Sequence, residues 1–338
     1  MIYYGIQIID PNIFLFASCI VCAIVASAIG SSWTTVATIG LALITIGKAI
    51  GIPTEISAGA IISGSYFGDK ISPLSDTTNL ASAMAEVDLI KHIKYMFFTT
   101  VPSIIISLIL FLILGFKFSG NINSNEINQI IATIEENFHI GPELFITPLI
   151  MIFLIFKKVP AFPTLFIGTI LGGITTILFQ EKVIFNISES NALTILTYYK
   201  VILQAMFGEI NIGGDLLSSN GMYGMLNTIW LIICAMIFGG VMEKAGFLKI
   251  IANVILKRAK TNTSLVTSTA GSCMFFNLTA SDQYLAIVVP GRMYKNIYKE
   301  NKLAPENLSR TLEDTGTVTS VLIPWNTCGA YQAGVLGV

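Results

Sequence analysis

Long apolar runs recur along this 338-residue chain and constrain its fold more than any other feature of the sequence. A transmembrane helix needs about 20 predominantly apolar residues. Runs that approach or exceed this length cover roughly residues 12–29, 31–50, 55–68, 95–116, 143–156, 160–180, 224–243 and 264–289, and a further apolar piece begins at 318. The sequence therefore predicts an all-α fold, a polytopic bundle of transmembrane helices.

Several of these runs are interrupted by polar or helix-breaking residues. The second, the third and the last two contain Gly, Ser, Thr, Asn or Pro. Broken backbone at membrane depth is tolerated only where it is buried in protein or lines a cavity. We therefore expect broken or re-entrant helices within the bundle.

The charge content excludes several classes of protein. Only 12% of the residues are charged, about half the share in soluble domains. The formal net charge of -1 argues against a nucleic-acid partner, which needs a clustered basic surface. The expected partners are the lipid bilayer and small inorganic ions, and a homodimer is left open.

Enzymatic or cofactor chemistry finds little support in the sequence. Cys19 and Cys22 form a C-x-x-C on an apolar run, but no further Cys/His pair completes a metal site. His92 and His139 stand alone and are expected to be surface histidines. No H-E-x-x-H motif occurs, and no nucleophile has a histidine base near the apolar runs. We expect no enzyme and no cofactor.

The placement of Lys and Arg predicts the orientation of the chain. Segment 86–94 is expected to be cytoplasmic, whereas 117–142 and 181–222 lean acidic and are expected outside. Segment 244–260 has the spacing of an amphipathic interfacial helix on the cytoplasmic face. Because the loop 291–310 is also basic, the run 264–289 is expected to enter the membrane and return.

A first polar cluster lies in SGSYFGDKISPLSDTTNLA, residues 63–81. Asp69 and Asp76 sit close to membrane depth on either side of Pro73, among serines, threonines and Asn79. A charge near the bilayer centre costs at least about 2.5 kcal/mol, so it is rarely idle. An interfacial turn with capping hydroxyls is one interpretation. The other is a site for a hard cation such as sodium, which prefers oxygen ligands.

A second polar cluster resembles the first and indicates an internal repeat. GSCMFFNLTASDQYLAIVVPG (271–291) parallels GSSWTTVATIG (30–40), and LEDTGTVTSVLIPWNTCGA (312–330) parallels GDKISPLSDTTNLA. The predicted organisation is a first repeat at 1–116, linking loops and spans at 117–222, and a second repeat at 223–338. Repeats with broken helices in corresponding positions indicate a transporter's central site.

Other charged residues near these clusters have two interpretations each. Asp282 is either an ion-site carboxylate or a packing residue bonded to a neighbouring helix. Glu313 and Asp314 lie nearer a basic loop, so an interfacial ion pair is as plausible as a role in the site. Lys70 is either a salt-bridge partner or a side chain that reaches the membrane interface.

These strings, with SCMFFNLTASDQYLAIVVPGRMY and EDTGTVTSVLIPWNTCGAY, resemble the NhaC-type sodium/proton antiporter family from about residue 12 onward. The resemblance implies a multi-pass secondary transporter of the bacterial cytoplasmic membrane, with inverted repeats and re-entrant hairpins, that exports sodium against protons. The family includes members that resemble malate/sodium-lactate exchangers. Members usually carry further spans at both ends, so the chain is expected to be a truncated form.

The expected mechanism needs a buried carboxylate that holds either a proton or sodium, so that loading one ion expels the other. The candidate sodium and proton carriers are Asp76, Asp69 and Asp282. The candidate neutral ligands are Ser72, Ser75, Thr78, Asn79, Asn277 and Thr279. A sodium-coupled carboxylate exchanger, with Lys70 as the cationic group, and an ion channel are the alternatives.

Overall fold

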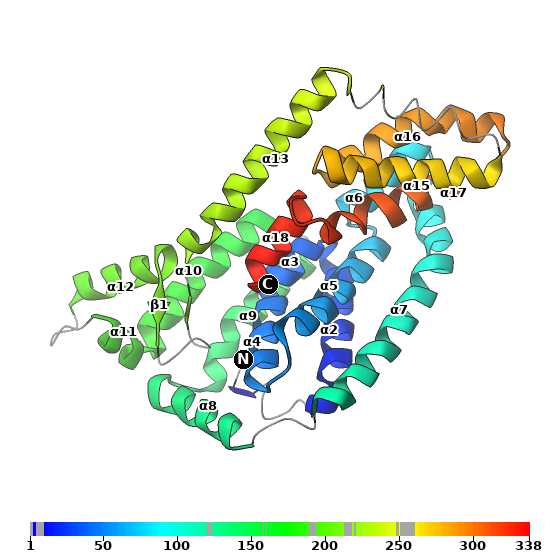
Figure 1. Cartoon of the computed structure of the whole chain (residues 1–338). Helices are drawn as coiled ribbons and strands as arrows, with labels where there is room; N and C mark the ends of the chain where they lie inside the picture. The colour runs from blue at the N-terminus through cyan, green and yellow to red at the C-terminus, as the bar shows by residue number, and fades with distance from the viewer. Residues whose placement is uncertain are drawn as a thin grey trace. The chain divides into compact units, whose positions relative to one another are not determined.

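The computed structural model describes residues 3–4, 10–119, 124–157, 159, 161–188, 194–212, 218–219, 221–247, 250 and 261–338 (Figure 1). The chain divides into two compact units. Unit 1 comprises residues 1–18, 38–60 and 111–226, and unit 2 comprises 19–37, 61–110 and 227–338. Both polar clusters of the sequence fall within unit 2, apart from the last residues of the 30–40 motif.

The described residues are mainly helical, which confirms the all-α prediction. The only described strands, β1 (Ile210–Asn211) and β2 (Ser218–Ser219), form a short antiparallel pair. The helices are η1 (Pro11–Ile13), α2 (Phe14–Ile29), α3 (Ser32–Thr35), η2 (Val36–Gly40), α4 (Leu41–Ala49), α5 (Thr54–Ile71), α6 (Asp76–Ala85), α7 (Leu89–Ser119), α8 (Ser124–Asn137), η3 (Pro142–Phe145), α9 (Ile146–Phe156), α10 (Ala161–Phe179), α11 (Glu181–Ser188), α12 (Ile195–Phe207), η5 (Met222–Met225), α13 (Leu226–Lys244), α15 (Asn262–Thr279), α16 (Gln283–Glu300), α17 (Pro305–Leu312), η6 (Glu313–Thr317), η7 (Ser320–Leu322) and α18 (Thr327–Leu336).

Several helices have the length and composition of membrane spans. Pro11–Ile29, Leu89–Phe118 and Met222–Met242 qualify among the described residues, and Pro163–Phe179 with Glu181–Ser188 would add a fourth span bent by 92°. The chain is therefore a multi-pass membrane protein. The predicted amphipathic helix at 244–260 lies largely outside the described residues.

Helices α15 and α16 form an antiparallel hairpin that turns at residues 280–282. Tyr294 Oη lies 2.9 Å from Ser272 Oγ, and Tyr298 Oη lies 3.1 Å from Thr269 Oγ1. The run 264–289 therefore turns back on itself, while its entry into the membrane and return to the same side stay a prediction. The basic segment 291–310 is not simply a loop, however, because residues 291–300 continue α16.

A hairpin of the same form lies earlier in the chain; we call it the first hairpin and the α15–α16 pair the second hairpin. Helix α2 ends at Ile29, the chain turns at Gly30–Ser31, and α3, η2 and α4 return, with Gly47 packed against the ring of Phe14. Each hairpin is followed by a broken helix: α5 breaks at 72–75 before α6, and the segment 305–322 breaks at 323–326 before α18. Hairpin plus broken helix is therefore the unit that occurs twice.

The backbone fixes the register of this repeat. Gly30 and Ser281 (φ 73° and 57°), Gly51 and Lys302 (φ 75° and 54°), and Glu86 and Gly337 (φ 56° and 69°) all adopt the left-handed conformation, and the three pairs have the same separation in sequence. The caps follow this spacing too, because Ser31 and Asp282 cap α3 and α16, and Ser75 and Asn326 cap α6 and α18. The repeat indicated by the sequence motifs thus extends to individual turns and caps, while its predicted boundaries and inverted orientation stay predictions.

Two glycines bring α5 close to α2. A Cβ atom at Gly64 would lie 2.1 Å from the carbonyl oxygen of Cys19, and one at Gly68 would lie 2.2 Å from that of Ala23. Small residues four apart let helices approach closely within a membrane, where packing rather than the hydrophobic effect holds helices together. This contact fixes the end of α5 that carries Asp69 and Lys70.

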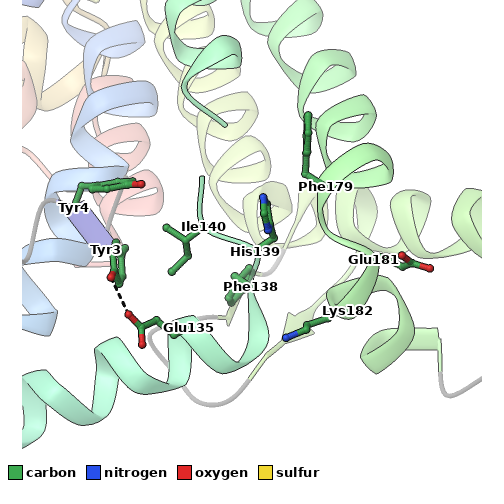
Figure 2. Close-up of a pocket in the computed structure, with 9 residues that line it drawn as sticks. All are labelled: Tyr3, Tyr4, Glu135, Phe138, His139, Ile140, Phe179, Glu181 and Lys182. Carbon is green, nitrogen blue, oxygen red and sulfur yellow. Dashed lines mark hydrogen bonds between the residues drawn. The ribbon is translucent and has the colours of Figure 1, made fainter. Parts of the chain in front are cut away.

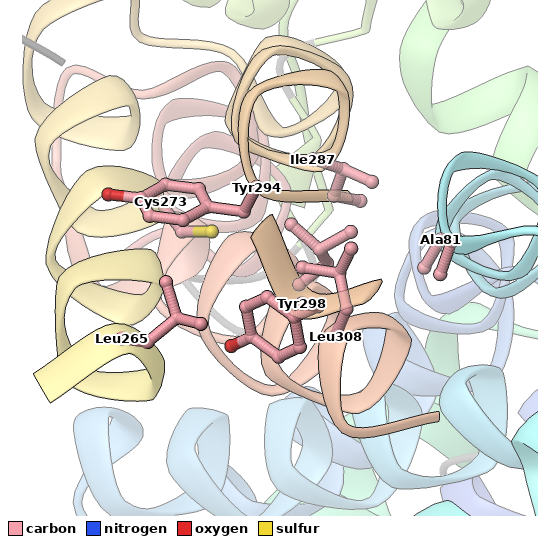
Figure 3. Packing of buried hydrophobic residues seen from close by; sticks show 9 residues of the cluster. Ala81, Leu265, Cys273, Ile287, Tyr294, Tyr298 and Leu308 are labelled. Carbon is pink, nitrogen blue, oxygen red and sulfur yellow. The ribbon is translucent and has the colours of Figure 1, made fainter. Parts of the chain in front are cut away.

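The second hairpin packs on α6 and α17 through a buried cluster (Figure 3). Its members include Ala81 on α6, Leu265 and Cys273 on α15, and Tyr294 and Tyr298 on α16. The two tyrosine rings are buried while their hydroxyl groups bond to α15, so the cluster combines apolar packing with satisfied polar groups. It holds the broken helix of the first repeat against the hairpin of the second.

Candidate functional site

The site begins where the first hairpin turn meets the first broken helix. Gly30 lies so close to this break that a Cβ atom there would stand 2.6 Å from the carbonyl carbon of Leu74. Beyond the break, Ser75 caps α6 by accepting a hydrogen bond from the Thr78 amide at 3.4 Å. Two interruptions of helical structure, far apart in sequence, are thereby in contact inside unit 2.

Asp69 is the buried carboxylate of this junction, with 5% of its surface exposed. The Ser32 amide, just after the hairpin turn, donates a 2.9 Å hydrogen bond to its Oδ2. Its other oxygen, Oδ1, has no hydrogen bond of regular geometry within the described ranges, although the hydroxyl groups of Ser32 and Ser75 lie beside the carboxyl group. A buried oxygen in this state can accept a proton donor or a cation.

Glu313, at the start of η6, is a second buried carboxylate and has no exposed surface. Thr77 Oγ1 donates to its Oε1 at 3.1 Å. Its Oε2 and the neighbouring Thr317 hydroxyl have no hydrogen bond of regular geometry in the part of the chain that the structure describes. The carboxyl group is within electrostatic reach of Asp69 and Lys70, so the two carboxylates belong to one cluster.

Lys70 and Asp314 form an ion pair across the repeat, with Nζ 2.5 Å from Oδ1. The side chain of Lys70 is 7% exposed and that of Asp314 is 24% exposed. Of the two interpretations of Lys70, the salt bridge is the one observed, although its partner comes from the second broken helix and not from the adjacent loop. The pair joins α5 to η6 directly beside Asp69 and Glu313.

The second repeat has an equivalent junction built from amides. The Thr327 amide donates to the carbonyl of Ser281 at 2.9 Å, which ties the second broken helix to the second hairpin turn. Asn326 Nδ2 donates to Asn277 O at 3.1 Å and to Oδ1 at 3.2 Å. Asn277 Nδ2 in turn donates to the carbonyl of Gly316 at 2.7 Å. The side chains of Asn277 and Asn326 that build this junction are buried and uncharged.

Equivalent aromatic residues reach from each hairpin turn to the other repeat. Trp33 stacks on Tyr331 of α18 with ring centroids 4.1 Å apart. Tyr284, which occupies the position equivalent to Trp33 in the second repeat, donates a 2.5 Å hydrogen bond to Oδ2 of Asp76 on α6. The two repeats therefore hold each other's short helices through matching positions.

The sequence-predicted site residues separate into three groups. Asp69, Ser75 and Thr78 lie at the first junction, where Thr78 Oγ1 donates to the Lys70 carbonyl at 3.1 Å. Asn277 belongs to the second junction. Four of the remaining residues bond the local backbone: Ser72 bonds the Leu74 amide, Asn79 the carbonyls of Pro73 and Ser75, Thr279 the Phe275 carbonyl, and Asp282 caps α16. Asp76 is exposed and bonds both the Thr77 amide and the Tyr284 hydroxyl of the other repeat.

Four further residues at the junctions did not enter the predicted set. Glu313, Ser32, Thr77 and Asn326 are all buried and all bond across an interruption or between repeats. The register of the repeat could have indicated Asn326, because it is the counterpart of Ser75 as a helix cap. The register could not have indicated Glu313, because the equivalent position in the first repeat is the apolar Ile62.

The expectation of surface histidines is wrong for His92. Its side chain is fully buried on α7, and neither ring nitrogen has a hydrogen-bond partner among the residues that the structure covers. The surface position was expected because no polar cluster lies near His92 in the sequence. In the structure, Lys70 and Asp314, which lie on other elements, are within electrostatic reach of His92. Within the described ranges, no group of three or more His, Cys, Asp or Glu side chains is arranged to hold a metal ion.

A separate pocket of about 700 Å³ lies in unit 1 and contains none of the predicted site residues (Figure 2). Tyr3 donates to Glu135 at its edge at 2.8 Å. His139 stacks on Phe179 and contacts Glu143 at 2.5 Å. The Glu143 pKa is lowered, chiefly by a hydrogen bond from its own backbone amide and then by His139.

Comparison with known proteins agrees with this architecture. A sequence profile described as the Na+/H+ antiporter family matches residues 64–338, which include the last turns of α5, the first break, the second hairpin and the second broken helix. The chain is 36% identical to the malate-2H(+)/Na(+)-lactate antiporter of Bacillus subtilis, over 100% of this chain and 70% of that protein. It is 35% identical to the Na(+)/H(+) antiporter NhaC of Alkalihalophilus pseudofirmus, over 100% of this chain and 71% of that protein.

One further relative is named for the exchange of amino acids instead of inorganic ions. The arginine/ornithine antiporter ArcD of Halobacterium salinarum is 35% identical over 100% of this chain and 68% of its own length. No solved structure matches the chain. The profile, the relatives and the paired broken helices lead to one conclusion: the chain belongs to the Na+/H+ antiporter family and is a secondary active transporter.

Proposed function

We propose that this chain exchanges sodium for protons at the junction formed by Asp69, Ser32, Ser75 and Glu313. The observation that carries the proposal is the state of Asp69. One oxygen is fixed by the Ser32 amide, while the other is buried without a regular hydrogen bond from any described residue. A carboxylate held in this way can bind a sodium ion or a proton, but it cannot hold both.

The charge of the cluster supports competition between the two ions. Three acidic groups, Asp69, Glu313 and Asp314, surround one basic group, Lys70. If all four are ionised, the cluster has an excess of negative charge in a buried position, which is costly. A sodium ion at Asp69, or a proton there, reduces this excess, so binding of one ion disfavours binding of the other.

The surrounding oxygens suit sodium as a transported ion. Hard cations take carboxylate, carbonyl and hydroxyl oxygens. The hydroxyl groups of Ser32 and Ser75 lie beside the Asp69 carboxyl group and can add to its oxygens. Motion of the broken helices against the hairpins would then change the side of the membrane from which the site is reached.

Carboxylate exchange is the second candidate function, because one relative is named for malate and lactate. It would need a cationic group that is available to the substrate. Lys70, the residue expected to supply that group, is paired with Asp314 at 2.5 Å. This pairing favours inorganic cations over carboxylates, and stimulation of flux by malate or lactate would reverse the preference.

The proposed location is the cytoplasmic membrane of a bacterium, with segment 86–94 on the cytoplasmic side. No cofactor enters the proposal, and the transported Na+ and H+ are substrates. Lys295, which pairs with Glu86 at 2.5 Å at the end of α6, adds a further basic residue to Lys91 and Lys94 on this side.

The test is sodium-driven proton flux in proteoliposomes that contain the full chain and a pH-sensitive dye. Asp69→Asn and Glu313→Gln should each abolish the flux, whereas Asp69→Glu should retain a reduced flux. Asp10→Asn is the matched control, because Asp10 is exposed and caps only η1. Wild-type flux in Asp69→Asn would refute the proposal.

A further inference from the structure

A cavity of about 420 Å³ lies in unit 2 between α5, α7 and the η6–η7 segment. Lys70 and Asp314, the ion pair of the site, both line it. The other polar lining comes chiefly from α7, which contributes Thr99, Thr100, Ser103 and Ser107. The cavity therefore connects a buried charged pair with a row of hydroxyl groups on a transmembrane helix.

The α7 hydroxyl groups occupy one face of a helix that is otherwise strongly apolar. Residues 99, 100, 103 and 107 are spaced by three or four positions, so they project from the same side. Ile105 and Ile109 are 49% and 53% exposed and are spaced to lie on the other side of the helix, toward lipid. A helix that only met lipid would not need this polar stripe.

The hydrogen bonds of these hydroxyl groups leave them as acceptors. Thr100 donates to Met96 O at 2.8 Å, Ser103 to Thr99 O at 2.8 Å, and Ser107 to Ser103 O at 3.0 Å. Because each hydroxyl group has a single proton, its lone pairs are left for donors such as water or for cations. Water enters a cavity that is polar and roomy, and each molecule needs about 30 Å³, so this volume accommodates on the order of ten.

We propose that this cavity is a water-filled path by which hydrated cations and protons reach the Lys70–Asp314 pair from one side of the membrane. The proposal rests on the proposed function, because it supplies the route to that site. The path ends at Asp314, which is adjacent in sequence to Glu313. It assigns a role to the α7 hydroxyl groups that packing does not require.

The test measures the reaction of single cysteines with a cationic, membrane-impermeant methanethiosulfonate. The full-length chain with Cys234→Ser is the background, since Cys234 is the exposed native cysteine among the five. Because the thiolate is the reactive form and needs water, Ser103→Cys and Ser107→Cys should react at least about tenfold faster than Ile105→Cys on the opposite face. Thr99→Cys replaces Ser103→Cys if that variant does not fold.

Equal, slow reaction of Ser103→Cys and Ile105→Cys would overturn the proposal, because the cavity would then be dry or filled by lipid. Labelling is read by mass spectrometry without any ion gradient, so this outcome does not depend on whether the protein exchanges sodium for protons. In proteoliposomes, labelling of Ser103→Cys should reduce flux by at least about half, because the bulky adduct occupies the path. Fast labelling with unchanged flux would show a wet cavity that is not the route, which also overturns the proposal.

Discussion

Gly30 and Ser281 share the left-handed backbone conformation, with φ of 73° and 57°, at equivalent turns of the two hairpins. Ser281 adopts this conformation without the freedom of glycine, and its carbonyl accepts the Thr327 amide at 2.9 Å. The two turns thus do the same structural task with different residues. Each brings a hairpin to the break in a helix of its own repeat.

Gly51 is another left-handed position of the repeat, equivalent to Lys302, and Gly51→Ala tests the backbone strain there. Gly51 has φ 75°, and a Cβ atom there would have no neighbour within 4 Å, so the substitution introduces only backbone strain. We expect a loss of about 1 kcal/mol in the free energy of unfolding. Gly59→Ala in α5 is the control. A Cβ atom at Gly59 also has no neighbour within 4 Å, and the backbone there is helical, so this substitution should be neutral or slightly stabilising. Equal effects in thermal unfolding would contradict the expectation.

The sequence predicted the class of fold because apolar length and polar interruptions are local signals. Asp69 was identified from its charge inside an apolar run, and the structure puts it in the junction. Asp76, equally charged, is exposed and bonded to Tyr284, a partner that is 208 residues away and leaves no local trace. For the same reason the sequence left a role in the site open for Glu313 and wrongly placed His92 at the surface, since burial and tertiary neighbours decide their state. Charge shows that a residue is unusual, but only packing shows where it points.

Replacement of Gly64 should disrupt the contact between α5 and α2. In Gly64→Ala the new methyl group would lie 2.1 Å from Cys19 O, and backbone cannot move aside without shifting a helix. We expect a loss of at least about 2 kcal/mol, measured by thermal unfolding in detergent. Gly172→Ala, which meets nothing within 4 Å on α10, provides the control. A stable Gly64→Ala protein would show that the helices are less close than the structure indicates.

Asp76→Asn should separate structure from transport. The carboxylate of Asp76 is exposed and accepts the Tyr284 hydroxyl, which joins the two repeats, so sodium-driven proton flux should remain near the wild-type level. Stability should fall by about 1 kcal/mol through the weakened hydrogen bond, and Tyr284→Phe should reproduce this loss. Abolished flux in Asp76→Asn, with normal flux in Tyr284→Phe, would return Asp76 to the ion site.

His92→Leu tests the cost of a buried imidazole without partners. A buried polar group without hydrogen bonds costs about 1–3 kcal/mol, and leucine has a similar size. Thermal stability should therefore be unchanged or increased, whereas His92→Ala should be less stable than His92→Leu because it leaves a cavity. A marked loss of stability in His92→Leu would indicate that the ring nitrogens are bonded in the protein.

The most direct test of the central claim is the pH dependence of sodium binding to the purified chain. If a proton and sodium exclude each other at Asp69, the apparent Kd for sodium, measured by calorimetry, should rise by about tenfold for each unit that the pH falls on the acid side of the titration. Asp69→Asn should bind sodium weakly and without this dependence. A wild-type Kd that does not change with pH, or Asp69→Asn protein with the wild-type profile, would contradict the account.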